Sequence, residues 1–452
     1  MTATLTEPAV RRRPLDAGTR TVAVGVLWAG LLLVTYWWAA DGIRDLGEWE
    51  TGLTSLGRLT GLLGADLLLI QVLLMARLPA VERAFGQDRL VKMHRTVGFT
   101  SFNLVLAHLV LITWGYAAGD LTRTPGELWD LVTNYPAMLL ATAGTACLVL
   151  TVVTSIRKAR AKLRYESWHL LHLYGYLGVG LALPHQLWTG QEFLTSTAAT
   201  VYWWSLWAAA AAAILVWRLG IPLWRNARHR LEVTAIVPED DDVVSVYLTG
   251  RHLDRLPARP GQFLGWRFLN RTGWTRGNPY SLSAAPDGRS LRITVRALGD
   301  GSALRGVRPG TRVLFEGPFG RLTESVRTRH RVALIGAGVG VAPLRALAED
   351  LEDAVLLHRF RRRPLFAAEL HALTRDRGLR VVDLPGHRRS PGSWLGDGVP
   401  VDDLTALPYL VPDIAERDVY ICGPAPWAES VRRAATAAGV PADRIHVEEF
   451  SW

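Results

Sequence analysis

The chain has 452 residues, which is enough for two or three domains that each bury a core. Its formal net charge of +10 is compatible with nucleic-acid binding. The Arg and Lys residues of the first half, however, cluster beside apolar segments, so no nucleic-acid partner is expected. Its two cysteines, Cys147 and Cys422, imply no disulfide framework and are too few for an iron–sulfur cluster without a partner's ligands. The composition changes near residue 220 from apolar to charged, which indicates a membrane half followed by a water-soluble half.

Six apolar segments reach or approach the roughly 20 residues that cross a bilayer. They lie near residues 21–40, 54–76, 94–116, 135–156, 166–187 and 198–217. The stretch from Thr21 is too long for a signal peptide and has no clearly placed cleavage site, so it is predicted as a span that follows a tail of residues 1–20. Residues 21–220 are therefore expected to form a six-helix transmembrane domain.

The positive residues predict an orientation for these spans. They gather in the N-terminal tail, in the second and fourth connections and after the sixth span, whereas the opposite connections carry only Arg44 and Arg123. Because Arg and Lys are enriched on the cytoplasmic side, the N-terminus and the soluble half are predicted to be cytoplasmic in a multi-pass protein of the cell membrane.

All five histidines of the membrane half lie in the third and fifth expected spans. A histidine at a span end can be a headgroup-level or capping residue, but intramembrane ionisable residues are costly and usually functional. Two neutral imidazoles from facing helices can occupy both axial positions of a haem iron. The third span carries His94 and His108, and the fifth carries His169, His172 and His185.

The spacing of these histidines supports two stacked sites. His94 to His108 is a rise of about 21 Å on a helix, and His172 to His185 is about 19.5 Å. On an ideal helix the first two lie within about 40° of one face, but the second two lie about 140° apart. The second pair therefore needs a bent or unwound helix, for which the span has Gly175, Gly178, Gly180 and Pro184.

With these residues the membrane half resembles the ferric reductase and NADPH oxidase superfamily, whose six-span domain holds two bis-histidine haems. The resemblance implies that His94 and His172 hold an inner haem b, and that His108 and His185 hold an outer one. His169 is left as a structural residue or a propionate contact. Arg58 is similar in placement to a family arginine near the outer haem, or it extends to the membrane interface as an ordinary arginine does.

Residues 229–326 are expected to form an antiparallel β-barrel, because short alternating runs occur at 231–237, 243–248, 291–296 and 312–316. The segment at 278–283 looks like the Arg-x-Tyr-Ser-x-Ser flavin motif of ferredoxin-NADP reductases, which implies FAD. An aromatic ring can cover the flavin and a hydroxyl can reach its edge. The implied FAD contacts are Asn278, Pro279, Tyr280, Ser281 and Ser283, with Ser281 also a catalytic candidate.

Asn278 departs from the motif, because the family usually has an arginine there for the FAD pyrophosphate. A nearby arginine and the amides of a turn could restore phosphate binding. The candidates are Arg296, Gly299, Gly301 and Ser302.

Residues 327–452 are expected to form an α/β nucleotide-binding domain. An apolar strand at 331–335 runs into a glycine turn and a helical pattern, which together provide a diphosphate site. The turn resembles the Gly-x-Gly-x-x-Pro nicotinamide site of the same reductases, and a Cys-Gly-Pro sequence and the C-terminal segment resemble two further landmarks. The implied NAD(P)H contacts are Gly336, Gly338, Gly340, Pro343, Cys422, Gly423, Pro424 and Glu448.

By the same resemblance, the ring of Phe450 covers the isoalloxazine until nicotinamide displaces it, with Trp452 as the second candidate. Both residues, together with Cys422, are catalytic candidates. Basic residues that include Arg359, Arg361 and Arg362 follow the expected strand at 355–358. They favour NADPH over NADH, because arginine pairs with a phosphate as a fork, or they form a basic loop that faces anionic lipid.

The predicted function is electron transfer from cytoplasmic NADPH through FAD and two haems to an external acceptor. Dioxygen, reduced to superoxide, is the preferred acceptor, because the external connections lack a cluster of iron-binding side chains. Ile112, however, occupies a position where such oxidases often have a histidine. A ferric reductase, a protein electron acceptor and a haem-free, membrane-tethered flavin diaphorase are the alternatives, and the oligomeric state is left open.

Overall fold

The computed structural model describes residues 14–163, 165–190, 193, 196–270, 277–296, 304 and 306–450. It divides into two compact units, one from Pro14 to Ile221 and one from Pro222 onward. Each unit has its own core, and the two are considered separately below.

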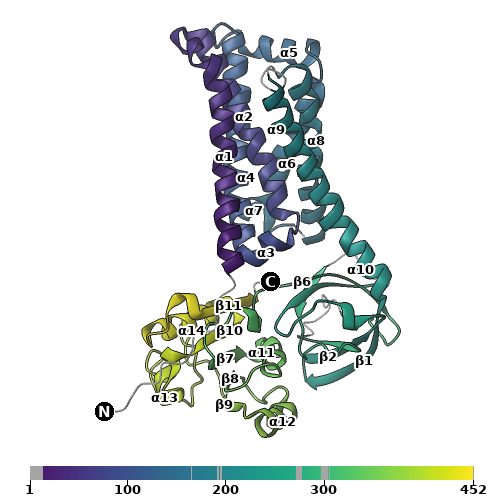
Figure 1. Cartoon of the computed structure of the whole chain (residues 1–452), viewed down its shortest axis with the longest axis vertical. Helices are drawn as coiled ribbons and strands as arrows, with labels where there is room; N and C mark the ends of the chain where they lie inside the picture. The colour runs from purple at the N-terminus through teal and green to yellow at the C-terminus, as the bar shows by residue number, and fades with distance from the viewer. Residues whose placement is uncertain are drawn as a thin grey trace. The chain divides into compact units, whose positions relative to one another are not determined.

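The first unit consists of long helices (Figure 1). They are α1 (Pro14–Gly42), α2 (Trp49–Met75), α4 (Gln87–Tyr116), α6 (Met138–Ser155), α8 (Tyr165–Trp188) and α9 (Thr197–Ala213), which continues as a π-helical segment (Ile214–Gly220). Shorter elements join them: η1 (Arg44–Gly47), α3 (Pro79–Phe85), α5 (Thr124–Asn134) and α7 (Arg157–Arg160). All six expected spans therefore correspond to helices.

Within the described residues, five helices are long and apolar enough to cross a membrane: Ala17–Gly42, Trp49–Met75, Arg89–Tyr116, Met138–Ser155 and Thr197–His229. The sixth long helix, α8, is outside this group although it has 24 residues. Its three histidines lower its hydropathy. The apolar helical region is thus established, and α8 as the fifth of six spans remains a prediction.

Close helix contacts in this unit depend on small residues. A Cβ atom on Gly57 of α2 would lie 2.8 Å from the side chain of Ile112 on α4. In the same way, a Cβ on Gly144 of α6 would lie 2.7 Å from the carbonyl oxygen of Gly178 on α8. Glycine at these positions lets the backbones of α2 and α4, and of α6 and α8, approach closely, as membrane helices commonly do.

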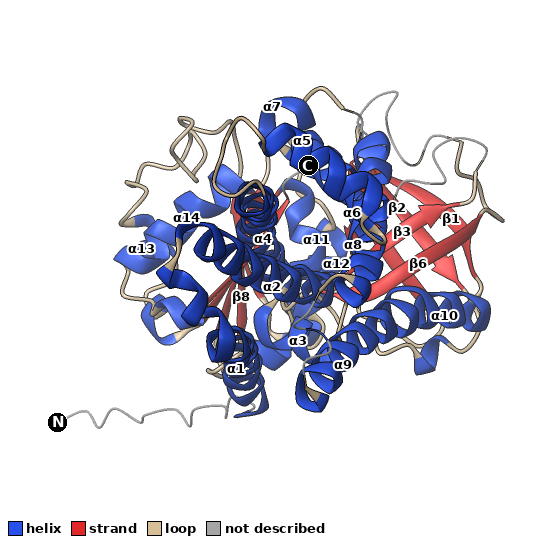
Figure 2. Cartoon of the chain, turned by 90° about the horizontal axis from the view of Figure 1, so that it is seen from above, coloured by secondary structure: helices blue, strands red, loops and turns tan. Residues whose placement is uncertain are grey.

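The second unit begins at Pro222 within α10 (Ile221–His229) and continues with an antiparallel sheet in which half-buried and buried side chains alternate along a strand. Its strands are β1 (Leu231–Asp240), β2 (Val243–Thr249), β3 (Phe263–Phe268), β4 (Asn278–Ser281), β5 (Ser290–Arg296) and β6 (Arg312–Phe319), in the order β4-β3-β6-β1-β2-β5. A bridge between Leu282 and Ile293 joins the two edge strands, so the sheet closes into a barrel. Figure 2 shows these strands in red.

A parallel five-stranded sheet follows, in the order β11-β10-β7-β8-β9. Its strands are β7 (Val332–Ala337), β8 (Ala354–Arg359), β9 (Arg380–Leu384), β10 (Asp418–Pro424) and β11 (Ile445–Phe450), and its helices are α11 (Val341–Ala348), α12 (Ala367–Arg377), α13 (Ala406–Leu410) and α14 (Ala425–Ala437). Separate apolar clusters cover its two faces. The strand order reverses between β7 and β10, and ligands bind at such a point in open α/β sheets.

Candidate functional site

Four histidines of α4 and α8 form two facing pairs. The ring centroids of His94 and His172 are 6.0 Å apart, with ring planes at 67°. Those of His108 and His185 are 6.5 Å apart, with planes at 42°. Imidazole nitrogens bind zinc at about 2 Å, and a similar bond to iron would put two rings on opposite sides of one ion about 6 Å apart. Two imidazoles leave the equatorial positions to a porphyrin, so both pairs fit the axial ligands of a haem.

Main-chain carbonyl oxygens face Nδ1 in two of these rings. Nδ1 of His94 lies 3.4 Å from the carbonyl oxygen of Gln71, and Nδ1 of His108 lies 2.8 Å from that of Gly57. A carbonyl oxygen only accepts hydrogen bonds, so Nδ1 carries the proton and Nε2 keeps its lone pair. Nε2 is then the nitrogen that can bind a metal ion.

The ring of His172 is held in the same way by a hydroxyl group. Ser155 Oγ lies 3.1 Å from Nδ1 of His172 and donates its own hydrogen to the Thr151 carbonyl oxygen at 2.7 Å. Ser155 Oγ also accepts a hydrogen bond from Trp168 Nε1 at 3.3 Å. Because the hydroxyl hydrogen is engaged, Ser155 accepts from His172 Nδ1–H, which again leaves Nε2 free for a metal. Partners of this kind orient metal-binding histidines.

The spacing within α8 does not prevent the second pair. An ideal helix would direct His172 and His185 about 140° apart, yet each ring faces a histidine of α4. Pro184 lies inside α8. Since proline has no amide hydrogen, the helical hydrogen bonds are interrupted one residue before His185. His169 lies beside Trp168, with ring centroids 6.5 Å apart, and takes no part in either pair.

The N-terminal half of α2 packs against this site. A Cβ atom on Gly61 would lie 2.5 Å from Nδ1 of His108, so only glycine leaves room for the ring. Arg58 forms an ion pair with Asp45 of η1 at 2.5 Å. Arg58 therefore has a carboxylate partner in the segment before α2. Neither expected role, a place near the outer haem or an extension to the membrane interface, included this ion pair.

The candidate flavin residues Asn278 to Ser281 form β4, which pairs with β3. The hydroxyl oxygen of Ser281 is buried and has no hydrogen-bond partner in the described part of the chain. Such a group normally has a partner, and a flavin edge would supply one. The side chain of Asn278 is buried instead, and its Nδ2 donates to the carbonyl oxygen of Trp266 at 3.4 Å. This hydrogen bond turns the side-chain amide of Asn278 toward β3.

Other candidate FAD contacts already have protein partners. Ser283 Oγ accepts from Arg292 Nε at 3.1 Å. Arg296 is half exposed and pairs with Asp242 at 2.5 Å. The remaining candidates for the pyrophosphate lie outside the described residues: Gly299, Gly301 and Ser302.

The two nucleotide motifs meet at the switch point of the parallel sheet. Gly338 has a φ of +54°, which glycine adopts without strain. A Cβ atom on Gly340 would lie 2.4 Å from the carbonyl oxygen of Cys422, and one on Gly336 would lie 3.0 Å from Cα of Val341. Glycine thus lets the turn pack tightly against β10 and α11. Pro343 lies within the first turn of α11, and Gly423 and Pro424 end β10.

The thiol of Cys422 is fully buried in the core between β7, β10 and α11. Burial, with a smaller effect from the nearby charge of Glu448, raises the pKa of the Cys422 thiol well above its usual range. The thiol therefore stays protonated at neutral pH. Glu448 lies on β11 opposite Cys422 in the sheet. Phe450 ends β11 and pairs with Pro424 through the main chain, and Trp452 lies outside the described residues.

The arginines that follow β8 differ in exposure. Arg359 is buried, and its guanidinium donates to the carbonyl oxygens of Phe360 and Leu384. Arg361 is exposed. In the loop after β9, the NH2 group of Arg388 is buried without a hydrogen-bond partner among the described residues. Arg361 and Arg388 can therefore meet a phosphate more readily than Arg359 can.

Sequence reasoning missed the partners of the histidines and a cluster of charges around Ser283. Gly57 and Gly61 are four residues apart, a spacing typical of close helix contacts, but nothing in the sequence links Ser155 to His172. Arg345 of α11 and Glu349, which caps that helix, are four residues apart, a spacing that is recognisable as a helical ion pair. Arg292 and Glu369 are 77 residues apart, so only the fold reveals their contact.

Comparisons with known proteins follow the same division of the chain. Residues 60–183 match the family described as "Ferric reductase like transmembrane component". This stretch contains His94, His108 and His172 and stops two residues before His185.

The C-terminal half is similar to reductases. An NADPH oxidoreductase of Mycobacterium tuberculosis is 28% identical over 249 residues, which cover 52% of this chain and 63% of that protein. The ferredoxin reductase component of a 3-ketosteroid-9-alpha-monooxygenase from Mycolicibacterium smegmatis is 31% identical over 239 residues, which cover 49% of this chain and 65% of the relative. The crystal structure of the Amycolatopsis cytochrome P450 reductase GcoB matches with a TM-score of 0.42 and 23% identity, over 49% of this chain and 69% of that one. The chain thus spans somewhat less than two thirds of the length of the first two relatives.

Proposed function

Because a ferric reductase-like transmembrane component is followed here by a ferredoxin reductase-like half, we propose that this protein passes electrons from cytoplasmic NADPH to an acceptor across the membrane. The route runs through FAD and two haem b groups. The observation that carries the proposal is the pairing of His94 with His172 and of His108 with His185.

The four histidines would hold the two haem irons, and a hydrogen-bond partner at Nδ1 orients the rings of His94, His108 and His172. The inner pair lies near the N-terminal ends of α4 and α8, and the outer pair lies about 20 Å further along both helices. Haem supplies a one-electron carrier at each level. In His94, His108 and His172, main-chain and hydroxyl acceptors keep Nδ1 protonated, so Nε2 of these rings stays available to iron.

In the reductase half, Tyr280 and Ser281 bind the flavin, and the glycine turn with Cys422 to Pro424 binds the nicotinamide coenzyme. Flavin accepts two electrons as hydride and releases them one at a time. The unpartnered hydroxyl of Ser281 supports this assignment. The buried thiol of Cys422 stays neutral, so this residue contributes through its main chain. Phe450 or Trp452 covers the flavin until the nicotinamide arrives.

The charge distribution supports a cytoplasmic reductase half and a plasma-membrane location. Dioxygen, reduced to superoxide, is the proposed acceptor. Ferric iron is the second candidate, and the description of the matched family favours it. NADPH is the proposed donor, which agrees with the name of one relative.

A difference spectrum of purified membranes tests the haem assignment. Dithionite-reduced minus oxidised spectra should show b-type bands with two haems per FAD. Superoxide and ferrous iron production, measured in parallel after NADPH addition, distinguishes the acceptors. Full FAD occupancy without b-type bands would leave a haem-free diaphorase as the function.

A further inference from the structure

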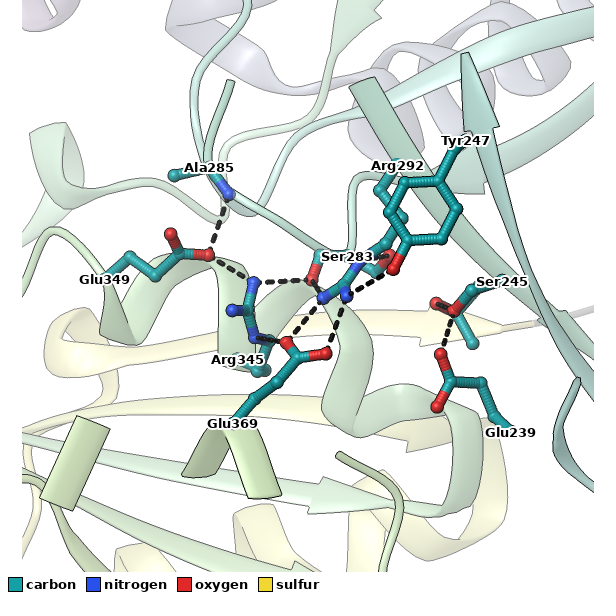
Figure 3. Close-up of polar contacts among 10 residues, drawn as sticks. Glu239, Ser245, Tyr247, Ser283, Ala285, Arg292, Arg345, Glu349 and Glu369 are labelled. Carbon is teal, nitrogen blue, oxygen red and sulfur yellow. Dashed lines mark hydrogen bonds and ion pairs between the residues drawn. The ribbon is translucent and has the colours of Figure 1, made fainter. Parts of the chain in front are cut away.

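A compact charge cluster joins the barrel to the nucleotide domain within the second unit. Arg292 of β5 and Arg345 of α11 both point toward the carboxylate of Glu369 on α12 (Figure 3). Glu349, the residue directly after α11, joins the cluster through Arg345. Two positive and two negative side chains from both domains thus form one connected group.

Arg292 and Glu369 form a two-pronged ion pair. NH1 of Arg292 donates to Oε1 at 2.7 Å, and NH2 donates to Oε2 at 2.9 Å. Only 6% of the arginine side chain is exposed, and its guanidinium lies 5.2 Å from the ring centre of Phe366. Two parallel bonds fix the relative orientation of the two groups, which a single contact would not do.

The charges of this pair support each other. Burial acts against the charged form of Arg292, but its hydrogen bonds to Glu369 and Tyr247 and its electrostatic attraction to both groups together outweigh burial, so the pKa of Arg292 is raised. Burial likewise acts against ionised Glu369, but its bond to Arg292 and the charge of Arg345 lower the pKa of Glu369. All three groups are therefore charged at neutral pH, and removal of one leaves the others without compensation.

The same arginines hold the segment that follows the flavin strand. The Ser283 carbonyl oxygen accepts from Arg292 NH2 at 2.7 Å and from Arg345 NH1 at 3.1 Å. The amide of Ala285 donates to Glu349 at 3.0 Å. The cluster therefore holds the main chain of this segment at Ser283 and Ala285 from the nucleotide domain.

The cluster contacts the chain close to both candidate ligand-binding motifs. Ser283 is two residues after Ser281, the candidate flavin contact, and Arg345 is two residues after Pro343, which ends the nucleotide motif. Each half of the proposed hydride-transfer site is thus anchored two residues along the chain from a candidate ligand contact. No other described charged pair connects these two motifs as directly.

We propose that Arg292, Glu369 and Arg345 are positioning residues that hold the flavin segment against the nucleotide helix and so set the distance between flavin and nicotinamide. The inference rests on the proposed transfer from NADPH to FAD. In that step a hydride leaves the dihydronicotinamide ring, which becomes a pyridinium, and the flavin takes up both electrons and the hydrogen. The cluster touches neither ring and acts only through the segments it holds.

Anaerobic stopped-flow measurement of flavin reduction in the full-length protein tests this role. At saturating NADPH, Glu369→Gln should slow flavin reduction by about tenfold or more, because small misplacements of reacting groups cost up to about a hundredfold. FAD content should be retained, and the isotope effect with 4-deuterated coenzyme should be fully expressed. The rate of flavin reduction in Arg292→Lys should lie between those of the wild type and Glu369→Gln, because lysine keeps the charge but cannot form two parallel hydrogen bonds.

A matched control is available on α14. Glu429 and Arg432 form the same two-pronged pair, with distances of 2.7 and 2.6 Å, but they are exposed and lie within one helix. Glu429→Gln should leave flavin reduction unchanged. Amide hydrogen exchange without coenzyme gives a second readout: the amides of Ser283 and Ala285 should exchange faster in Glu369→Gln but not in Glu429→Gln.

The outcomes separate this inference from the function on which it rests. If NADPH fails to reduce the flavin of the wild-type protein, the proposed function falls. If the wild type is reduced and both Glu369→Gln and Arg345→Gln react within twofold of its rate, only the positioning role is overturned. If Glu369→Gln does not fold, Arg292→Lys and Arg345→Gln decide, and a uniform rise in exchange with loss of FAD in both would assign the cluster to stability alone.

Discussion

His358, near the end of β8, is a fully buried histidine in the reductase half. Neither of its ring nitrogens has a hydrogen-bond partner in the described part of the chain, and its ring lies 5.1 Å from that of Phe360. Burial lowers the pKa of His358 from 6.5 to about 4. The imidazole is therefore neutral in the folded protein at pH 7.

This burial makes stability depend on pH. Between pH 6.5 and about 4 the unfolded chain binds a proton that the folded protein does not, so stability is lost as pH falls through this window. The total loss is up to about 3 kcal/mol. His358→Phe should flatten this part of the profile in urea unfolding at several pH values, whereas the exposed His371→Phe should not. An unchanged slope in His358→Phe would assign the acid sensitivity to other groups.

Coenzyme preference is a second residue-scale question. Arg359 bonds main-chain carbonyl oxygens, whereas Arg361 is exposed and Arg388 has an unpartnered NH2 group. Arg361→Ala or Arg388→Ala should therefore raise KM for NADPH about tenfold and leave KM for NADH nearly constant, because only NADPH has the 2'-phosphate. Arg359→Ala should instead lower stability. Steady-state kinetics with both coenzymes decides, and equal effects would point to a membrane-facing basic loop.

These residues also show what sequence can and cannot supply at this scale. The basic run after β8 is visible in the sequence, but the partners of Arg359 are not, because Leu384 lies on another strand. The spacing of the histidines supports two stacked sites, but the choice of His94, His108, His172 and His185 as haem ligands comes from the family resemblance and stays a proposal. The sequence does not reveal that the hydroxyl of Ser281 is buried without a hydrogen-bond partner among the described residues, because its burial depends on strands far away in the chain.

At the scale of elements, the glycine turn after β7 gives a sharp prediction. A Cβ atom at position 340 would lie 2.4 Å from a main-chain oxygen, which cannot move without displacing β10. Gly340→Ala should therefore raise KM for NADPH at least about tenfold, in line with the cost of overpacking. Haem content should stay normal. The control is Gly392→Ala, where the added atom meets open space; similar KM values in both variants would remove the turn from the coenzyme site.

A second element-scale prediction concerns the contact of α1, α2 and α9. The hydroxyl of Tyr202 donates to buried Asp66 at 2.5 Å, and a Cβ atom on Gly30 would lie 2.7 Å from that hydroxyl. Gly30→Val should destabilise the membrane unit by about 1–3 kcal/mol. Gly25→Val, on the same helix but with nothing within 4 Å, should not. Thermal unfolding in detergent compares them, and equal melting temperatures would show that these helices do not pack as described.

Elements were predictable where one local pattern dominates. Alternating strands such as 231–237 and 243–248 form β1 and β2, and the apolar strand before the glycine turn forms β7. The fifth expected span was harder, because the histidines that give α8 its role also lower its hydropathy. The ideal-helix angle between His172 and His185 misled for a physical reason, since Pro184 interrupts the hydrogen bonds of that helix.

In the whole molecule, the proposed function requires that electrons pass from FAD to the inner haem and then to the outer haem. Because positive residues lie beside the inner pair, this pair is proposed to face the cytoplasm together with the reductase half. The outer pair is about 20 Å further along α4 and α8, at the depth proposed for the acceptor. The chain order of membrane unit, barrel and nucleotide domain was readable from composition and motifs, whereas the positioning cluster required the three-dimensional contacts.

Anaerobic NADPH titration of single histidine variants, with haem and FAD counted, tests this order most directly. His108→Leu and His185→Leu should each keep one haem per FAD, reducible by NADPH, and reduce no acceptor. His94→Leu and His172→Leu should stop electrons at the flavin, while His169→Leu should keep both haems. Two haems per FAD in His185→Leu, or acceptor reduction at the wild-type rate in that variant, would contradict the account.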